Sequence, residues 1–207
     1  MKKISLLGDS VIDNKSYVQY GQNSVLEHLE SLSNYTYQQT AVDGDTTHDM
    51  LNSQMFSSEI ENSSNIVLSI GGNDLLQSIH LMFEDNSSIN DSISGFQNFI
   101  FKPLEKRFET IVETLSSHGA KLLLCTVYEG DLGRTNEFRD VLDSSKIMVS
   151  AFNDIVYKTA KKFGSDVLEL RHIFTSSEDY ANPIEPSHIG GEKLAKAIIK
   201  WVEVDET

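Results

Sequence analysis

Apolar residues gather in short runs along the chain, and longer amphipathic segments separate these runs. Three runs are almost continuously apolar, as expected of strands that are covered on both faces of a parallel sheet. They span residues 4–7, 66–70 and 122–127. Two further strands are predicted over residues 35–42, a more polar run suited to a sheet edge, and over residues 167–174.

The segments between these runs carry apolar residues with the 3.6-residue period of a helix. The pattern predicts helices over residues 25–32, 75–83, 104–115, 147–163 and 194–202. Pro103 suits a first helical turn, and Gly119 and Gly164 suit C-terminal caps. The alternation of strand and helix indicates an α/β fold with an open parallel sheet and helices on both faces. The polar stretch 84–95 is interpreted as a surface loop or lid.

Ligands of such sheets bind at the carboxyl ends of the strands, so the residues that follow each strand are the candidates for function. Gly8-Asp9-Ser10 follows the first strand, where Ser10 suits a nucleophile or an ordinary helix N-cap. Gly44 follows the second strand and can present a bare N–H, or it marks a plain turn. Gly71-Gly72-Asn73-Asp74 follows the third strand, where the Asn73 side chain offers N–H donors.

An acid and an imidazole come near the end of the chain, in Glu185-Pro186-Ser187-His188. Pro183 and Pro186 stiffen this loop. The arrangement could hold one ring nitrogen against the carboxylate and leave the other free as a base, or His188 could be a cap or a surface residue. Taken together, four strand ends bring Ser, Gly, Asn and an acid with His to one crevice.

These four sites resemble the SGNH, or GDSL, family of serine esterases and lipases, and the resemblance covers essentially all of residues 1–207 as one domain. The family pattern is Gly-Asp-Ser near the N-terminus, a lone Gly, Gly-x-Asn-Asp, and Asp-x-x-His near the C-terminus. The resemblance implies a flavodoxin-like three-layer α/β/α sandwich whose five-stranded parallel sheet has the order 2-1-3-4-5.

The resemblance also implies the chemistry, which is cleavage of a carboxylic ester or thioester through an acyl-enzyme intermediate. Ser10 would be the nucleophile, and His188 would be the general base and later the acid. The Ser10 N–H, the Gly44 N–H and the Asn73 amide would form the oxyanion hole. The physics agrees, because a tetrahedral oxyanion needs fixed donors and a hydroxyl needs a base to take its proton. No metal or organic cofactor is required.

The chain departs from the family at Glu185, where the family usually has Asp. Glu185 could still be the third member of a catalytic triad, since Glu has this role in some α/β-hydrolases. Alternatively, a Ser-His dyad operates with Glu185 exposed, and Glu178 and Asp179 are rival carboxylates. The departure also supports a hypothesis from another class, a catalytically silent member of the fold that binds a small ligand or a partner protein.

A third hypothesis starts from Asp9, Asp13 and Asp74, which could hold Mg²⁺ for phosphoryl transfer or receiver-type signalling. A receiver needs an Asp at the end of the third strand and a Lys after the fifth. Here the third strand ends in Gly-Gly-Asn-Asp, and no Lys follows the fifth until Lys193. The remaining histidines are assigned no catalytic role: His28, His48, His80, His118 and His172.

Composition narrows the classes of partner. The 31 acidic and 17 basic residues give a net charge of −14, which disfavours nucleic acids and anionic membrane surfaces. No stretch approaches the roughly 18 apolar residues of a membrane span, and residues 4–7 are too few for a signal peptide, so a cytoplasmic location is expected. The single cysteine, Cys125, is predicted to be a buried thiol. The sequence indicates a small-molecule ester as partner and leaves the oligomeric state open.

Overall fold

A computed structural model of the chain describes residues 2–53, 60–79, 88–136 and 138–204. A five-stranded parallel sheet lies at its centre with the strand order β2-β1-β3-β4-β5. The strands are β1 (Lys3–Gly8), β2 (Thr36–Gln39), β3 (Asn65–Ser69), β4 (Lys121–Cys125) and β5 (Asp166–Leu168). The order of the strands is the one that the resemblance implied.

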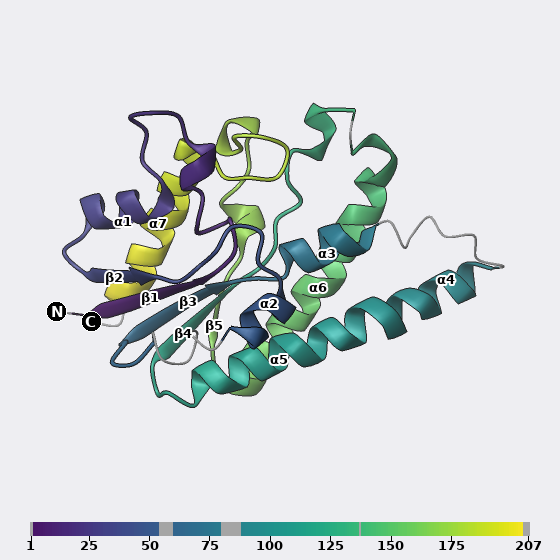
Figure 1. Cartoon of the computed structure of the whole chain (residues 1–207), viewed down its shortest axis with the longest axis horizontal. Coiled ribbons are helices and arrows are strands. Elements are labelled where there is room, and N and C mark those ends of the chain that lie inside the picture. The colour runs from purple at the N-terminus through teal and green to yellow at the C-terminus, as the bar shows by residue number, and fades with distance from the viewer. Residues whose placement is uncertain (1, 54–59, 80–87, 137, 205–207) are drawn as a thin grey trace.

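Helices cover both faces of this sheet, so the fold is a three-layer α/β/α sandwich (Figure 1). The α-helices are α1 (Val25–Leu32), α2 (Thr47–Asn52), α3 (Gly72–Ser78), α4 (Ile89–Gly95), α5 (Lys102–Ser116), α6 (Leu142–Phe163) and α7 (His188–Val204). The π-helix η3 (Phe96–Phe101) joins α4 to α5. Short 3-10 helices are η1 (Lys15–Tyr17), η4 (Leu132–Arg134), η5 (Arg139–Val141), η6 (Leu170–His172) and η7 (Ser177–Asp179). The helices α1 and α7 lie on one face, and α2, α3, α5 and α6 lie on the other.

Alternation along the strands divides the core into two apolar clusters, one on each face. Ile4 and Leu6 of β1 face the cluster under α1 and α7, and Leu7 faces the cluster under α5 and α6. Phe108 of α5 and Phe152 of α6 meet edge to face in this second cluster, with ring centroids 5.4 Å apart. Burial on both faces explains why β1, β3 and β4 are nearly continuous apolar runs in the sequence.

The last strand and the polar stretch 84–95 differ from the prediction, and residues 80–83 of the helix predicted over 75–83 lie outside the described residues. The last strand ends at Leu168 rather than at residue 174, because the N–H of Leu170 donates to Thr126 Oγ1 and the chain turns into η6. In the polar stretch 84–95, residues 89–95 form α4, and residues 84–87 lie outside the described residues. The Ser88 side chain caps this helix by accepting the Asp91 N–H at 3.2 Å, a local signal that its polar composition concealed.

Cys125 is buried at the end of β4, as predicted. Burial raises the pKa of its thiol, which disfavours the reactive thiolate. None of the helices in the described ranges combines the length and the apolar character that a membrane crossing requires.

Candidate active site

The turn after β1 brings Ser10 to the carboxyl end of the sheet. Gly8 has φ +129°, and a Cβ at this position would lie 1.7 Å from the Ser69 carbonyl oxygen, so only glycine fits. The Asp9 N–H then donates to the same oxygen at 2.9 Å, and the Asp9 carboxylate accepts the Val11 N–H at 3.1 Å. These bonds fix the turn and leave Ser10 only 6% exposed.

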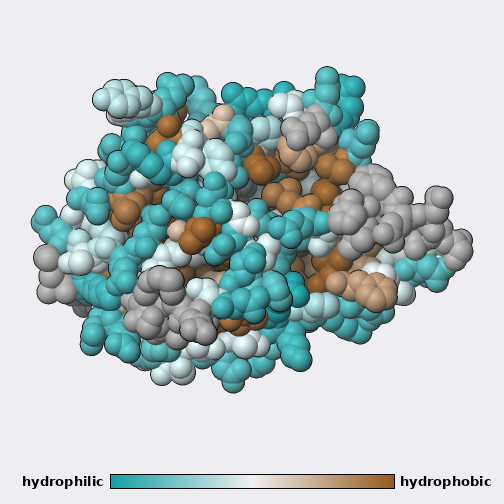
Figure 2. Space-filling view, in the orientation of Figure 1, coloured by the Kyte–Doolittle hydropathy of each residue, from teal (hydrophilic) through white to brown (hydrophobic). Residues whose placement is uncertain are grey.

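Ser10 lies on a crevice between α3, the N-terminal half of α6 and the loop before α7. Its empty volume is about 720 Å³, part of it open to solvent. One wall is apolar, with contributions from Leu75, Leu76, Ile79, Val127, Met148 and Val149. Figure 2 shows apolar surface gathered in a hollow of this part of the molecule. Asp9, Ser10, Asn73 and Glu185 add polar groups, so the crevice can accept an apolar chain beside a polar reacting centre.

Glu185 is the ionisable side chain that faces the Ser10 hydroxyl. It is 6% exposed, and its Oε2 has no hydrogen-bond partner among the described residues. Burial raises the pKa of Glu185, and the nearby charge of Asp43 raises it further. The interaction with the Ser10 hydroxyl acts in the opposite direction and lowers this pKa. A buried carboxyl whose pKa lies closer to neutrality is a better proton acceptor than an ordinary glutamate.

Asp9 is a second buried carboxyl in the crevice, at 3% exposure. Burial raises its pKa to about 8, and the charges of Glu185 and Asp74 also raise it, while the hydrogen bond from the Val11 N–H opposes the shift. Burial therefore favours the protonated, neutral form of Asp9. Since a charged Asp9 would repel a charged Glu185, the neutral form of Asp9 favours an ionised Glu185.

Three N–H donors lie at the neighbouring strand ends. Gly44 has φ +88°, and the backbone N–H groups of Ser10 and Gly44 have no hydrogen-bond partner within the described ranges. Asn73 lines the crevice at the start of α3, and its Nδ2 donates to the Asp45 carbonyl at 2.9 Å. This bond uses one of the two N–H groups of the amide.

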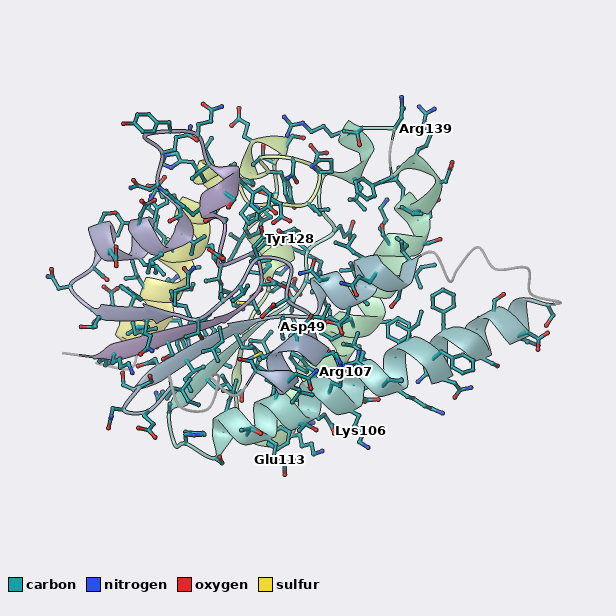
Figure 3. All side chains as sticks on the ribbon, viewed as in Figure 1. Asp49, Lys106, Arg107, Glu113, Tyr128 and Arg139 are labelled. Carbon is teal, nitrogen blue, oxygen red and sulfur yellow. The ribbon has the colours of Figure 1, made fainter. Side chains whose placement is uncertain are left out.

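Asp74 connects the loop that carries Gly44 to α3 and α5. Its carboxylate accepts the N–H of Thr47 at 2.8 Å and the hydroxyl of Thr47 at 2.6 Å. It also accepts a hydrogen bond from Arg107, whose Nη2 is 3.0 Å away. Arg107 projects from α5 toward α2 (Figure 3). The carboxylate of Asp74 is therefore held by Thr47 and Arg107.

His188, the expected general base, is not among the residues that line the crevice. His188 is the first residue of α7, and its Nδ1 lies 3.1 Å from the Asn23 N–H donor and 3.0 Å from Nε2 of His28. The centroids of the two imidazole rings are 4.6 Å apart. Ser187 caps the N-terminus of α7, since its Oγ accepts the N–H groups of residues 189 and 190, and His188 in the first helical turn contacts His28 of α1.

Solved structures with the same architecture span nearly the whole chain. One is a catalytic mutant of Axe2, an acetylxylan esterase from Geobacillus stearothermophilus (TM-score 0.71, 14% identity, 96% of this chain and 93% of that chain). The lipase Lip_vut3 from a goat rumen metagenome (0.71, 16%, 97% and 97%) and a lipase/acylhydrolase from Enterococcus faecalis (0.65, 18%, 99% and 97%) are also similar. The chain has the fold of the SGNH hydrolases. No family model matches its sequence. No curated protein matches it either.

Within this SGNH fold, the carboxylates of the C-terminal loop have separate surroundings. Glu185 is buried, so the expected dyad with an exposed Glu185 does not describe this structure. The two rival carboxylates, Glu178 and Asp179, are not among the residues that line the crevice. Asp179 is fully buried, accepts the N–H groups of Thr175 and Ser176, and pairs with Lys193 at 2.7 Å. Glu178 is exposed.

The carboxylates of the Mg²⁺ hypothesis point to different partners. The carboxylate of Asp13 accepts a hydrogen bond from Nε2 of Gln39 at 3.0 Å and another from the N–H of Asp43 at 3.1 Å. Asp74 is bound to Thr47 and Arg107, as described above. In the part of the chain that the structure describes, no three His, Cys, Asp or Glu side chains are grouped to hold a metal ion.

Sequence reasoning missed two residues of this region. Asn182 accepts the N–H groups of residues 184 and 185 through its Oδ1, both at 2.9 Å. The Asn182-Pro183 dipeptide is a turn signal that was available in the sequence. His28 had no such signal, because its partner His188 is 160 residues away. Of the other histidines without a role, His48, His118 and His172 are exposed, and His80 lies outside the described residues.

Proposed function

We propose that the chain is a serine hydrolase that cleaves small carboxylic esters or thioesters in this crevice. The observation that carries the proposal is the crevice at the carboxyl ends of the central strands, which Ser10 and the buried carboxyl of Glu185 line together. In the proposed reaction, Ser10 Oγ attacks the carbonyl carbon of the ester and forms an acyl-enzyme. Water then releases the acyl group as a carboxylic acid.

The oxyanion of this reaction needs donors that are already in place. The N–H groups of Ser10 and Gly44, which have no partner among the residues that the structure describes, and the second N–H of the Asn73 amide supply three donors. Fixed donors stabilise the tetrahedral intermediate more than the ground state, because charge develops on the oxygen only during the attack. The hydrogen bonds that Thr47 donates to Asp74 hold the loop of Gly44 beside Asn73, which supports this role.

The apolar wall of the crevice suits the acyl group of the substrate. Leu75 and Leu76 of α3 and Met148 and Val149 of α6 line one side of it. Removing a short aliphatic chain from water against such side chains stabilises the complex by about 0.8 kcal/mol for each buried CH₂ group. The fold of the similar esterases and lipases agrees with an ester substrate.

A second candidate function is binding of such a ligand without turnover. The observation that favours it is the position of His188, which contacts His28 and is not among the residues that line the crevice. In this case the crevice would bind an ester or a fatty acid and would leave it intact.

The experiment that separates the two functions is incubation of the protein with a fluorophosphonate, followed by mass mapping of the adduct. p-Nitrophenyl acetate, butyrate and octanoate are assayed in parallel. The proposal expects a single adduct on Ser10 and hydrolysis that Ser10→Ala abolishes. Saturable binding of a fluorescent fatty acid without an adduct and without turnover would contradict the proposal and favour the binding function.

A further inference from the structure

We propose that Glu185 takes the proton of Ser10 during catalysis and that Asn182 is the positioning residue that holds Glu185 in place. The inference rests on the proposed function. It assigns to residues 182 and 185 the places that the family resemblance gave to residues 185 and 188. Glu185 thereby becomes the base itself rather than the acid behind an imidazole.

The spacing and the geometry agree on this assignment. Asn182 and Glu185 are separated like the acid and the imidazole of the Asp-x-x-His pattern, three positions earlier in the chain. The side chain at position 185 lines the crevice and interacts with the Ser10 hydroxyl, whereas the Nδ1 of His188 contacts the Asn23 N–H and His28.

The loop that carries Glu185 is held from several sides. Asn182 Oδ1 accepts the N–H groups of Ile184 and Glu185, and the Glu185 carbonyl accepts the Ala181 N–H at 2.8 Å. Tyr128 donates its hydroxyl to the Ile184 carbonyl at 2.6 Å.

Asn14 completes this set. It is fully buried and donates from Nδ2 to the Pro186 carbonyl at 3.2 Å. A backbone held by so many bonds keeps the carboxyl near Ser10 without the entropic cost of ordering a mobile loop.

The proton transfers balance with this single group. As Ser10 Oγ bonds to the acyl carbon, its proton passes to the Glu185 carboxylate. The resulting carboxylic acid returns the proton to the leaving oxygen or sulfur as the bond between it and the acyl carbon breaks. In the second half, water gives a proton to Glu185 as it attacks, and Glu185 returns this proton to Ser10 as the acyl-enzyme bond breaks.

The surroundings of Glu185 compensate in part for the weak basicity of a carboxylate. Burial raises the pKa of Glu185, and its Oε2 has no partner that would compete for the proton among the described residues. The neutral form of Asp9, whose burial raises its pKa to about 8, avoids a second negative charge beside the reacting pair.

The first test compares Glu185→Gln with His188→Ala in the hydrolysis of p-nitrophenyl butyrate. Glu185→Gln keeps the size of the side chain and removes the basic site, so kcat is expected to fall by about 10² to 10⁴-fold. His188→Ala is expected to retain kcat within about threefold, since an imidazole outside the crevice accepts no proton from Ser10. A wild-type rate in Glu185→Gln, or a loss of more than about a hundredfold in His188→Ala, would overturn the proposal.

The second test examines Asn182 with a pair of variants. Asn182→Ala removes the acceptor of the two N–H groups and is expected to lower kcat by about ten- to a hundredfold, because a small displacement of the base slows proton transfer. Asn182→Asp keeps the acceptor and is expected to restore kcat. If Asn182→Ala changes only the melting temperature, or if Asn182→Asp does not rescue kcat, Asn182 has no positioning role.

The third test replaces both residues to rebuild an acid–imidazole pair, as Asn182→Asp with Glu185→His. Imidazole is the stronger base at pH 7, so kcat/KM is expected to rise at least about tenfold and to follow an ionisation near pH 6.5. If the wild type is silent and the double variant hydrolyses the ester, the assignment of positions stands and the proposed function fails. If the folded double variant also lacks activity and forms no adduct with a fluorophosphonate, the assignment of positions is wrong.

Discussion

The crevice at Ser10 and the junction of α1 with α7 share one loop and differ in chemistry. In the crevice, Glu185 turns toward the ends of the strands and faces a hydroxyl. Three positions later, His188 turns toward α1 and meets His28. A helix that starts between two residues can therefore send their side chains to different sites, although their spacing in the sequence suggests a pair.

The two regions also respond to pH in opposite ways. The crevice holds two buried carboxyls, Asp9 and Glu185, whose pKa values are raised by burial. The junction holds His28, whose pKa is lowered by burial and by the nearby charge of His188. Acid therefore favours the protonated acids of the crevice and disfavours the imidazole pair.

The largest contrast between the regions is expected from Ser10→Ala. Loss of the nucleophile should lower kcat/KM for p-nitrophenyl esters by about 10³-fold or more. The matched change in the other region, His188→Ala, should leave kcat/KM within about threefold. Equal losses in both variants would remove the distinction between the two regions.

A smaller loss of activity is expected when the Asn73 side chain, a proposed oxyanion donor, is removed. Asn73→Ala should lower kcat by about 10² to 10³-fold, because it removes a donor that acts mainly in the transition state. Asn23→Ala is the matched control at the junction, since Asn23 contacts His188 through its backbone N–H, which the variant keeps. An unchanged kcat in Asn73→Ala, with melting temperatures that agree, would contradict the proposed oxyanion hole.

Asp9 is expected to make stability depend on pH. Its pKa is about 8 in the folded protein and near 3.8 in the unfolded chain, so the folded state binds more protons between these values. The free energy of unfolding should therefore fall as pH rises from about 4 to about 8, by at most about 1.4 kcal/mol per pH unit from this group. Urea unfolding at several pH values measures the slope.

Asp9→Asn provides the control for this slope, because the amide oxygen keeps the bond from the Val11 N–H. The variant should have a flatter dependence of unfolding free energy on pH than the wild type. Identical slopes in the two proteins would show that Asp9 is ionised in the fold at neutral pH.

The smallest effect is expected from replacing His28 at the junction of α1 with α7, and it concerns stability at low pH. The lowered pKa of His28 means that the unfolded chain binds a proton more readily than the folded protein. The contribution of His28 to stability is therefore present above about pH 6.5 and is lost as pH falls below this value toward the lower pKa of the folded state. His28→Gln should remove this part of the acid sensitivity and leave kcat unchanged. A change in kcat at pH 7 that exceeds the change in stability would connect the junction to catalysis.

The elements of the fold were largely predictable from the sequence. The continuous apolar runs of β1, β3 and β4 follow from burial on both faces, and the stripes of α5 and α6 follow from one buried face. The end of β5 was not predictable, because it depends on a bond from Leu170 to the side chain of Thr126, which is 44 residues away.

The site was predictable in part. Ser10, Gly44 and Asn73 lie at strand ends, where topology alone brings them to one edge of the sheet. The C-terminal pair of site residues was not predictable, because the sequence is compatible with two pairs at the same spacing. These are Glu185 with His188 and Asn182 with Glu185. The choice depends on the position of the helix start at Ser187 and on distant anchors such as Asn14 and Tyr128.

The dependence of ester hydrolysis on pH, measured as kcat/KM in the wild type and in His188→Ala, tests the central claim most directly. If a carboxyl is the base, both proteins should gain activity with rising pH through the same ionisation, which lies above the usual range of glutamate because burial raises the pKa of Glu185. An ionisation near pH 6.5 in the wild type that disappears in His188→Ala would contradict it and return the role of base to His188.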